Sequence, residues 1–562
     1  MNRRPRWILA LLALALTVGC AWPGRLLRGY AEGSPPDLGM ALNGAMEAGS
    51  DPAAVGLAHF AFDDWGSLNT DGLDRYTVPW KLVATAVVVH ARDLRGLPVD
   101  TSTLNRILTE LGFVTPARVV NWRGPAPTLT RPLGLVHGTM SRGFPRVELE
   151  GANVGCVACH SGVLYDGDGR PTREVWVGLP NTSLNLQAYG VAVFEALRHI
   201  QGREEELEGA LRTLFPEVTE AEWSTIEDHG LPAVRERFAG EWRDRTTPFP
   251  FVNGSAGLTN GVGSLKNLVG LVDEDDIESE VGFTSIPDLG GTLLRSSLLY
   301  DGTYVAAGRP RFVPMDVRDV TDDHVDGLAD VVTFFIVPTL GVEPDRARAG
   351  YDGVRLFMEF LRELRSPPFP GRLDRARANR GRGVYDRDCA RCHGSYSPGV
   401  DDVELVRFPN RLVPQDSMGT DPRRWQAVSE DFVQRVAETA YGPYLDVART
   451  GGYVAPPLTA VWATAPYLHN GSVPTLWHLL NPTRRPARFM VGGHRLDFDL
   501  VGIAGSLDGE GRYAYGEGYT PWSVPALYDT RRPGMSATGH ERQFAHLSEE
   551  EKLALMEFLK VL

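Results

Sequence analysis

Apolar side chains recur at helical spacing along much of the chain and predict a mainly α protein. Val354, Phe357, Leu361 and Leu364 fall on one side of a helix over residues 352–365. A proline-rich stretch follows directly and ends that helix, because proline has no N–H to donate to the preceding turn. The same reasoning predicts further helices over residues 80–97, 184–200, 374–385 and 547–562.

Two of the predicted helices begin with a capping box, in which a hydroxyl side chain and a carboxylate three residues later satisfy free backbone N–H groups. Thr219 and Glu222 form one such pair and start a helix that runs through Ile226. Ser548 and Glu551 form the other at the start of the last helix. In that helix we expect Leu553, Met556 and Leu559 to share the buried face.

Long loops are expected between these helices, because the chain has 61 glycines and 40 prolines among its 562 residues. Residues 253–263 are predicted to be a glycine-rich loop, and residues 166–169 (Asp-Gly-Asp-Gly) a turn. The acidic run over residues 273–280 is predicted to be a solvated loop rather than a calcium site.

The composition is that of a globular protein, with 43% hydrophobic and 23% charged residues. It excludes disordered chains and polytopic membrane proteins. The formal net charge is −14, and no long basic stretch occurs after the first few residues. We therefore expect no nucleic-acid partner.

The first residues are typical of an export signal. Arg3, Arg4 and Arg6 precede an apolar run over residues 7–18 that is short for a membrane span. The run leads into Cys20, and this ending resembles the bacterial lipobox, in which the cysteine is lipidated after cleavage. Lipidation of Cys20 would make a lipid anchor the only membrane contact, and Ala21 after it favours the outer membrane of a Gram-negative cell envelope, facing the periplasm or the cell surface. The alternative is an unmodified Cys20 in a signal peptide cleaved further along.

The other four cysteines form two copies of one motif, each of which ends in a histidine. Cys156-Val157-Ala158-Cys159-His160 and Cys389-Ala390-Arg391-Cys392-His393 both match the c-type haem attachment signature, Cys-x-x-Cys-His. Two thiols one helical turn apart add to the haem vinyl groups, and the adjacent imidazole becomes the proximal iron ligand. The sequence therefore predicts two covalently bound c-type haems.

Two other uses of these cysteines compete with haem. Two Cys-x-x-Cys knuckles can build a zinc site, but here each has its own histidine and they lie far apart in the sequence. Local disulfides are possible in an oxidising compartment, although they give no reason for the histidine after each pair. Haem is the interpretation that uses all six residues.

The positions of the two motifs suggest how the chain is organised. We expect a lipoprotein signal peptide over residues 1–19 and an N-terminal segment over 20–120 that wraps the first haem domain. The first c-type haem domain is expected over residues 121–345 and the second over 346–562. The fold class is then mainly α with many long loops, with two cytochrome c-type haem domains and a wrapping segment.

A stretch in the second half of the chain resembles a known family. Residues 465–472 (Ala-Pro-Tyr-Leu-His-Asn-Gly-Ser), within a longer match over residues 457–476, resemble the signature of the dihaem cytochrome c peroxidase superfamily. The RoxA-like rubber-oxygenase branch is the closer match, with further similarity over residues 155–162, 489–502, 539–540 and 547–562. Residues 20–120 show no such likeness.

The resemblance implies different roles for the two haems. The first haem would have His160 as its one protein ligand and an open face, so that it binds dioxygen or peroxide and is the catalytic site. The second haem would have two protein ligands and would relay electrons. Its ligands would be His393 and, by similarity to the rubber-oxygenase branch, His540. A methionine replaces one ligand in classical dihaem peroxidases, and the candidates for it here are Met490 and Met535.

Several other residues have two interpretations each. His540 is the second ligand or an exposed loop residue. His469, inside the family signature, is expected to be structural rather than a ligand. His137 is expected to be a surface or core residue that does not reach the first haem, and Phe251 and Phe283 are expected to pack in the core rather than line a distal pocket.

These observations favour an exported dihaem oxidoreductase with peroxide or dioxygen as its small-molecule oxidant. Peroxidase chemistry needs a polar group that assists O–O cleavage, whereas oxygenase chemistry on an apolar alkene such as polyisoprene needs a dry pocket. The sequence leaves this choice open. A small redox protein is a possible partner, and the alternative function is that of an electron-transfer cytochrome without substrate chemistry.

Overall fold

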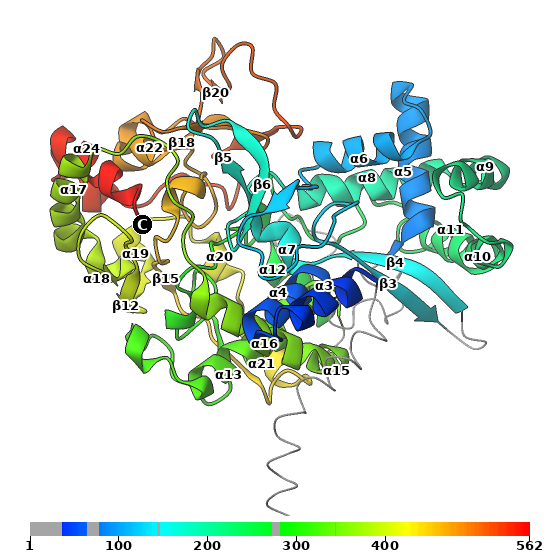
Figure 1. Ribbon diagram of the computed structural model, residues 1–562, viewed down its shortest axis with the longest axis horizontal. Helices are drawn as coiled ribbons and strands as arrows, with labels where there is room; N and C mark the ends of the chain where they lie inside the picture. The colour runs from blue at the N-terminus through cyan, green and yellow to red at the C-terminus, as the bar shows by residue number, and fades with distance from the viewer. Residues whose placement is uncertain (1–35, 64–77, 143–146, 273–280, 343) are drawn as a thin grey trace, which may run out of the picture.

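The computed structural model describes residues 36–63, 78–142, 147–272, 281–342 and 344–562 (Figure 1). Helices and long irregular loops make up most of these ranges, so the predicted fold class, mainly α with many loops, is confirmed. The predicted signal peptide, Cys20 and the acidic run over 273–280 lie outside the described residues. Within the described ranges, no helix has both the length and the apolar character needed to cross a membrane.

The predicted helices are present, with ends set by the expected residues. Thr219 accepts a hydrogen bond from the Glu222 backbone at 3.2 Å, and Ser548 and Glu551 form a complete capping box. Gly96, in the left-handed conformation, ends the helix that begins at Trp80. Their bounds are Trp80–Arg95 (α5), Leu186–His199 (α8), Glu220–Thr225 (α10), Tyr351–Glu363 (α16), Arg375–Asp388 (α17) and Glu549–Leu559 (α24).

Two local expectations were wrong. Leu553 of α24 is 44% exposed, because the buried face of this helix is formed by Ala554, Leu555, Met556, Phe558 and Leu559. The glycine-rich stretch over 253–263 is not wholly a loop. It contains strand β7 (Leu258–Thr259) and the start of helix α12 (Gly261–Leu268), which Asn260 caps.

Several small sheets support the helices. The longest strands, β3 (Leu135–Arg142) and β4 (Val147–Val154), form an antiparallel hairpin, and β2 (Arg118–Val119), β6 (Pro171–Val177) and β5 (Ser161–Tyr165) form a second sheet in that order. The expected turn over residues 166–169 joins β5 to β6, with Asp166 accepting two backbone hydrogen bonds. The β5 strand begins directly after His160, so this sheet fixes one side of the first motif.

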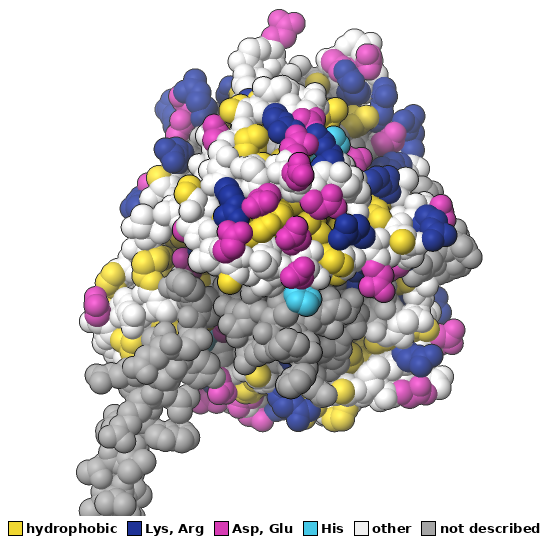
Figure 2. Space-filling model, turned by 90° about the vertical axis from the view of Figure 1, so that its right-hand side faces the viewer, with side chains coloured by type: hydrophobic (Ala, Val, Ile, Leu, Met, Phe, Trp, Pro, Cys, Tyr) yellow, Lys and Arg dark blue, Asp and Glu magenta, His cyan; other side chains and the backbone are white. Residues whose placement is uncertain are grey.

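Figure 1 shows a helical lobe on the right and a second group of helices on the left. The right-hand lobe contains α5, α8, α10, α6 (Thr101–Glu110), α9 (Glu204–Leu214) and α11 (Leu231–Ala239). Phe194, Trp223 and Trp242 fill its core. Figure 2, which looks onto the right-hand side of the molecule, shows acidic and basic side chains interspersed with small apolar areas.

One close helix crossing stands next to each Cys-x-x-Cys-His motif. On the left, α17 runs into Cys389 and crosses α24, where a Cβ on Gly381 would lie 1.8 Å from the Ala554 carbonyl oxygen. In the centre, α4 (Pro52–Phe62) crosses α16, where a Cβ on Gly56 would lie 2.1 Å from the Leu356 carbonyl oxygen. Glycine at each crossing lets the two backbones approach more closely than any side chain permits.

The α4–α16 crossing belongs to the core that contains Cys156. Phe60 of α4 stacks on Phe357 of α16 with ring centres 3.8 Å apart, and both share a hydrophobic cluster with Cys156 and Val157. Helix α16 therefore packs beside the first motif, although it lies within the range predicted for the second domain. The domain boundaries themselves stay a prediction.

We expect Gly381→Ala to lower the free energy of unfolding by about 1–3 kcal/mol, because the added methyl group forces α17 away from α24. Gly383→Ala is the matched control on the same helix, since a Cβ there has no neighbour within 4 Å. It should raise stability by up to about 1 kcal/mol through helix propensity. Guanidinium unfolding followed by circular dichroism measures both, and equal effects of the two substitutions would contradict the crossing.

Candidate haem-binding site

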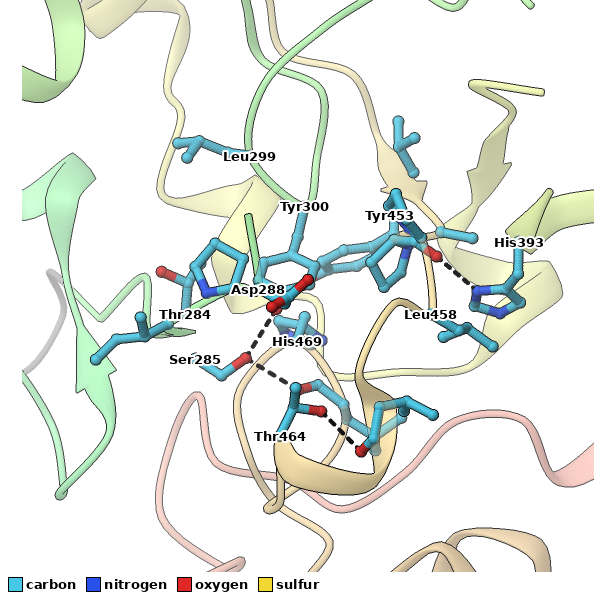
Figure 3. A pocket seen from close by; sticks show the side chains of 18 of the residues that line it. Thr284, Ser285, Asp288, Leu299, Tyr300, His393, Tyr453, Leu458, Thr464 and His469 are labelled. Atoms are coloured by element: carbon cyan, nitrogen blue, oxygen red, sulfur yellow. Dashed lines mark hydrogen bonds between the residues drawn. The ribbon is translucent and has the colours of Figure 1, made fainter. Parts of the chain in front are cut away.

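Both Cys-x-x-Cys-His motifs open onto one continuous cavity of about 540 Å³. Its lining includes all the predicted attachment cysteines and the three predicted histidine ligands, namely Cys156, Cys159, His160, Cys389, Cys392, His393 and His540. Figure 3 shows the middle of this cavity, where Tyr300, Tyr453 and His469 gather between Ser285 and His393. The fold thus brings together two motifs that are far apart in the sequence.

The first motif forms a single helical turn, α7 (Cys156–Cys159), and His160 follows it. The His160 backbone N–H donates to the Cys156 carbonyl at 3.1 Å, which fixes the histidine at the end of the turn. Its side-chain Nδ1 donates to the Pro287 carbonyl at 3.1 Å. A carbonyl can only accept, so Nδ1 carries the proton and Nε2 keeps its lone pair for a metal.

The second motif repeats this arrangement. Cys389 ends α17, and the turn continues as α18 (Ala390–His393). His393 Nδ1 donates to the Pro456 carbonyl at 2.8 Å, the bond drawn beside His393 in Figure 3. Burial lowers the pKa of His393 and lowers that of His160 to about 4, so both imidazoles stay neutral at physiological pH. Both side chains are therefore in the state that binds iron.

No disulfide joins the four cysteines of the two motifs. Burial raises the pKa of Cys159 and of Cys389 to about 12, and that of Cys156 further still. Surroundings of this kind disfavour a charged thiolate. Among the residues that the structure describes, no group of three or more His, Cys, Asp or Glu side chains could hold a metal ion. The surroundings suit cysteines that end as uncharged thioethers.

His540 faces His393 across the cavity. The two imidazole rings are nearly parallel, at 25°, with their centres 6.2 Å apart. A nitrogen ligand binds its metal at about 2 Å, and the ring centre lies about 1 Å further, so two imidazoles on opposite sides of one metal have centres about 6 Å apart. The observed separation therefore fits an iron between the two rings.

The backbone around His540 holds the ring in this place. His540 has a φ of +67°, and its N–H donates to the Met418 carbonyl at 3.2 Å. Arg485 donates to the Gly539 carbonyl at 2.9 Å and pairs with Glu541 at 3.0 Å. Burial, with smaller contributions from His393 and Arg485, lowers the pKa of His540 to about 3. His540 thus lines the cavity, and its ligation of iron stays a prediction.

The two predicted methionine candidates do not line the cavity. Met490 belongs to strand β16 (Arg488–Val491), and Met535 is 2% exposed within the hydrophobic core. Met358 and Met418 line it instead, and sequence reasoning missed both. Neither has a local pattern that marks it, because each is placed by helix packing between distant segments.

The other candidate residues take the expected structural places. His469 lines the cavity, its Nδ1 lies 3.4 Å from the Thr420 hydroxyl, and burial lowers its pKa to about 3. His137 lies outside the cavity lining and bonds Glu150 through Nδ1 at 2.9 Å. Phe251 and Phe283 are also outside the lining and pack in the core.

The surroundings of His160 differ from those of His393. On the side of His160, apolar side chains from α4, α16 and the π-helix η6 (Val332–Ile336) form a hydrocarbon wall of the cavity. These side chains are Phe60, Val332, Phe335, Ile336, Phe357, Met358 and Leu361. The Phe60 ring lies 6.4 Å from the His160 ring at an angle of 46°. Within the described residues, no second imidazole stands across from His160 as His540 does from His393.

Sequence reasoning assigned no chemistry to the segment that supplies Phe60. The available signal was that residues 53–62 are almost continuously apolar, which is typical of a helix buried on all sides. That pattern indicates burial, but not which cavity the helix faces.

Two buried arginines in the cavity wall suit the carboxylates that every haem carries. Arg424 is 2% exposed and pairs with Asp301 at 3.2 Å, while its Nε and Nη1 have no hydrogen-bond partner within the described residues. Arg295 donates to the carbonyls of Ser297 and Leu299. Burial lowers the pKa of Arg295 to about 10, so it stays charged at neutral pH. Unpaired buried donors of this kind need a hydrogen-bond acceptor, and a haem propionate would supply a charged one.

Comparison with known proteins finds a family model that is similar to part of this site. Residues 452–490 match the family model described as RoxA-like, cytochrome c-like. The chain therefore contains a cytochrome c-like domain. The matched stretch includes Pro456, which accepts the His393 hydrogen bond, and His469 in the cavity wall. It supports the RoxA-like branch of the predicted resemblance.

Two curated relatives come from Sinorhizobium fredii (strain NBRC 101917 / NGR234). The chain is 31% identical to the uncharacterized protein y4iM over 237 residues, which cover 37% of this chain and 50% of the relative. It is 28% identical to the uncharacterized protein y4iJ over 264 residues, covering 35% of this chain and 41% of that relative. The chain thus spans half or less of the length of these relatives.

We expect His540→Ala to convert the haem at the His393 motif from low spin to high spin, because it removes the ring opposite His393. The haem should stay attached, since both thioethers and His393 remain. Electron paramagnetic resonance of the ferric protein measures the change.

His229→Ala is the matched control, because His229 is exposed and does not line the cavity. It should leave the spectrum unchanged. A His540→Ala protein that keeps its full low-spin signal would show that another residue is the second ligand.

Proposed function

We propose that the chain is an exported dihaem c-type oxidoreductase. Peroxide or dioxygen is activated at the His160 site, and electrons are exchanged through the His393 site. The match to a RoxA-like cytochrome c-like domain supports a haem oxidoreductase. The finer assignment rests on the differences between the two ends of the cavity.

The observation that carries this proposal is the asymmetry between the two histidines. His393 has a second imidazole opposite it at the separation that suits a metal between them. The Phe60 ring lies 6.4 Å from the His160 ring, and the adjoining cavity wall is apolar. The His393 site is thus built to be closed to small ligands and the His160 site to be open.

A bound haem supplies an iron that binds oxygen or peroxide where one axial position is free and only exchanges electrons where both are filled. The residues of this chain decide which case applies. His160 and His393 would each bind an iron through Nε2, His540 would be the second protein ligand at the His393 motif, and Arg424 and Arg295 would neutralise propionates. Phe60, Phe335 and Phe357 keep bulk water away from the first motif.

A second candidate, favoured by the same wall, is an oxygenase that cleaves an apolar alkene such as polyisoprene. Among the described residues that line the cavity there is no glutamate, and its glutamine, Gln543, is a neighbour of His540. The hydrocarbon wall beside His160 suits an apolar substrate better than a group that assists O–O cleavage. A plain electron-transfer cytochrome remains the alternative if both irons have two protein ligands.

The proposal also includes location and partners. With Cys20 lipidated, the protein would be held at the outer membrane by its lipid alone and would face the periplasm or the cell surface. A small redox protein is proposed to exchange electrons with the His393 site. No nucleic-acid partner is proposed, because the net charge of −14 opposes one.

We expect two haems per chain and one molecule of carbon monoxide bound per two haems in the reduced protein. Carbon monoxide needs a free axial position, and among the described residues a second imidazole stands opposite His393 but not opposite His160. The pyridine haemochrome assay counts the haems, and an optical titration counts the bound gas.

The double variant Cys389→Ser and Cys392→Ser provides the control, because it removes both thioethers of the second motif and should halve the covalent haem stain while carbon monoxide binding persists. Reduced protein that binds no carbon monoxide would favour the electron-transfer alternative.

Cys20→Ser should move the protein from the membrane fraction to the soluble fraction of the cell envelope, because the lipid would be its only anchor. Immunoblots of fractionated cells test this. Continued sedimentation of the Cys20→Ser protein with membranes would place the anchor elsewhere.

A further inference from the structure

Two loops of the cavity wall orient the two motif histidines. One loop, residues 287–290, provides the Pro287 carbonyl that accepts from His160 at 3.1 Å. The other, residues 456–459, provides the Pro456 carbonyl that accepts from His393 at 2.8 Å. Each loop therefore sets the direction and basicity of one imidazole.

Each loop is also anchored to its own motif. The Leu289 N–H donates to the Gly178 carbonyl, and the Gly178 N–H donates to the His160 carbonyl, both at 2.9 Å. On the other side, the Leu458 N–H donates to the Tyr396 hydroxyl at 2.9 Å, and Tyr396 follows shortly after His393. Movement of either loop is thus transmitted to the histidine of that motif.

Thr459 joins the two loops. Its hydroxyl lies 2.6 Å from Asp288 Oδ1 and 3.2 Å from the Gly290 carbonyl oxygen, and Asp288 also accepts from the Gly290 N–H at 2.8 Å. A Cβ on Gly290 would lie 2.5 Å from the Thr459 hydroxyl and 2.6 Å from Asp288 Oδ1. Only glycine at position 290 permits this contact.

The contact between Asp288 and Thr459 lies in the wall of the cavity. Asp288 and Thr459 both line the cavity between the two motifs, and Asp288 is labelled near the centre of Figure 3. Burial raises the pKa of Asp288 to about 7. A buried carboxyl that loses a hydrogen-bond donor pays the full cost of desolvation, so the loops gain by staying together.

We propose that Asp288 and Thr459 are a positioning pair that couples the two haem sites by tying together the loops that orient His160 and His393. The chain of contacts runs from His160 through Pro287, Asp288, Thr459 and Pro456 to His393. This inference rests on the proposed binding of haem at both motifs. It does not depend on which oxidant or substrate the protein uses.

The physical consequence is a shared control of ligand strength. A carbonyl that accepts firmly from Nδ1 makes the imidazole a stronger donor to iron and lowers the reduction potential. If the loops separate, both carbonyls lose their fixed positions and both imidazoles become weaker ligands. A substitution in the loop that orients one histidine should therefore also change the ligand strength of the other histidine.

The test uses the haem-loaded full-length protein and Thr459→Val, which keeps the shape of the side chain but removes its hydroxyl. We expect the midpoint potentials of both haems to rise. The iron–histidine stretching frequency of the reduced His160 site, measured by resonance Raman spectroscopy, should fall. Thr459→Ser restores a hydroxyl and should return both values towards those of the unchanged protein.

Thr530→Val is the matched control, because the Thr530 hydroxyl donates to the Ala487 carbonyl at 3.0 Å and Thr530 does not line the cavity. It should leave both haems unchanged. Asp288→Asn, which keeps an oxygen that can accept from Thr459, should disturb the stretching frequency less than Asp288→Ala. This series guards against a general loss of structure in any one variant.

The proposal is overturned if Thr459→Val changes only the His393 site or changes neither site, or if Thr459→Ser fails to restore the first site. Haem content is measured first, by the pyridine haemochrome assay. Absence of haem from the unchanged protein would contradict the proposed function, whereas normal haem content with an unaffected His160 site would contradict the coupling alone.

Discussion

The hydrogen bond from each motif histidine to a prolyl carbonyl is the constraint on which the rest of the site depends. A Cys-x-x-Cys-His turn fixes the backbone of its histidine but leaves the ring free to rotate. The carbonyls of Pro287 and Pro456 remove that freedom and leave each Nε2 aimed at the cavity. Everything else in the cavity wall, from His540 to the buried arginines, is arranged around these two ring positions.

The second requirement is close backbone packing next to each motif. The glycine at each helix crossing, Gly56 and Gly381, gives up side-chain volume so that two helices can support the wall of the cavity. Both crossings depend on a glycine, but different side chains lie beside them. The α17–α24 crossing stands beside the motif that His540 faces, while the α4–α16 crossing brings Phe60 and Phe357 to the other motif.

The parts of the structure that could be predicted are those coded locally. The capping pairs at Thr219 and Ser548 predicted helix starts, and the apolar period predicted α5 and α16 with bounds near those found. The two haem motifs were recognisable by themselves, and the second half of the chain carried the family signature. In each case the residues that form the feature lie within a few positions of one another.

What could not be predicted depends on contacts between distant segments. Nothing near Phe60 tells which cavity its helix faces, and nothing near Asp288 indicates that Thr459 will lie within hydrogen-bond distance. The short strands escaped notice because stretches of two or three residues show no alternation to detect. The place of His540 was expected only by resemblance, since its neighbours Glu541 and Arg542 equally suit an exposed loop.

The distribution of the cavity wall along the chain has a consequence for how the protein matures. Phe60 near one end of the described chain and Leu555 and Leu559 near the other line the same space, together with segments from the middle. The enclosure cannot close until almost the whole chain is in place, so its two halves cannot mature independently. With haem bound in this cavity as proposed, cofactor capture and completion of the fold would be one cooperative event, and the affinity of the chain for haem would become part of its folding free energy.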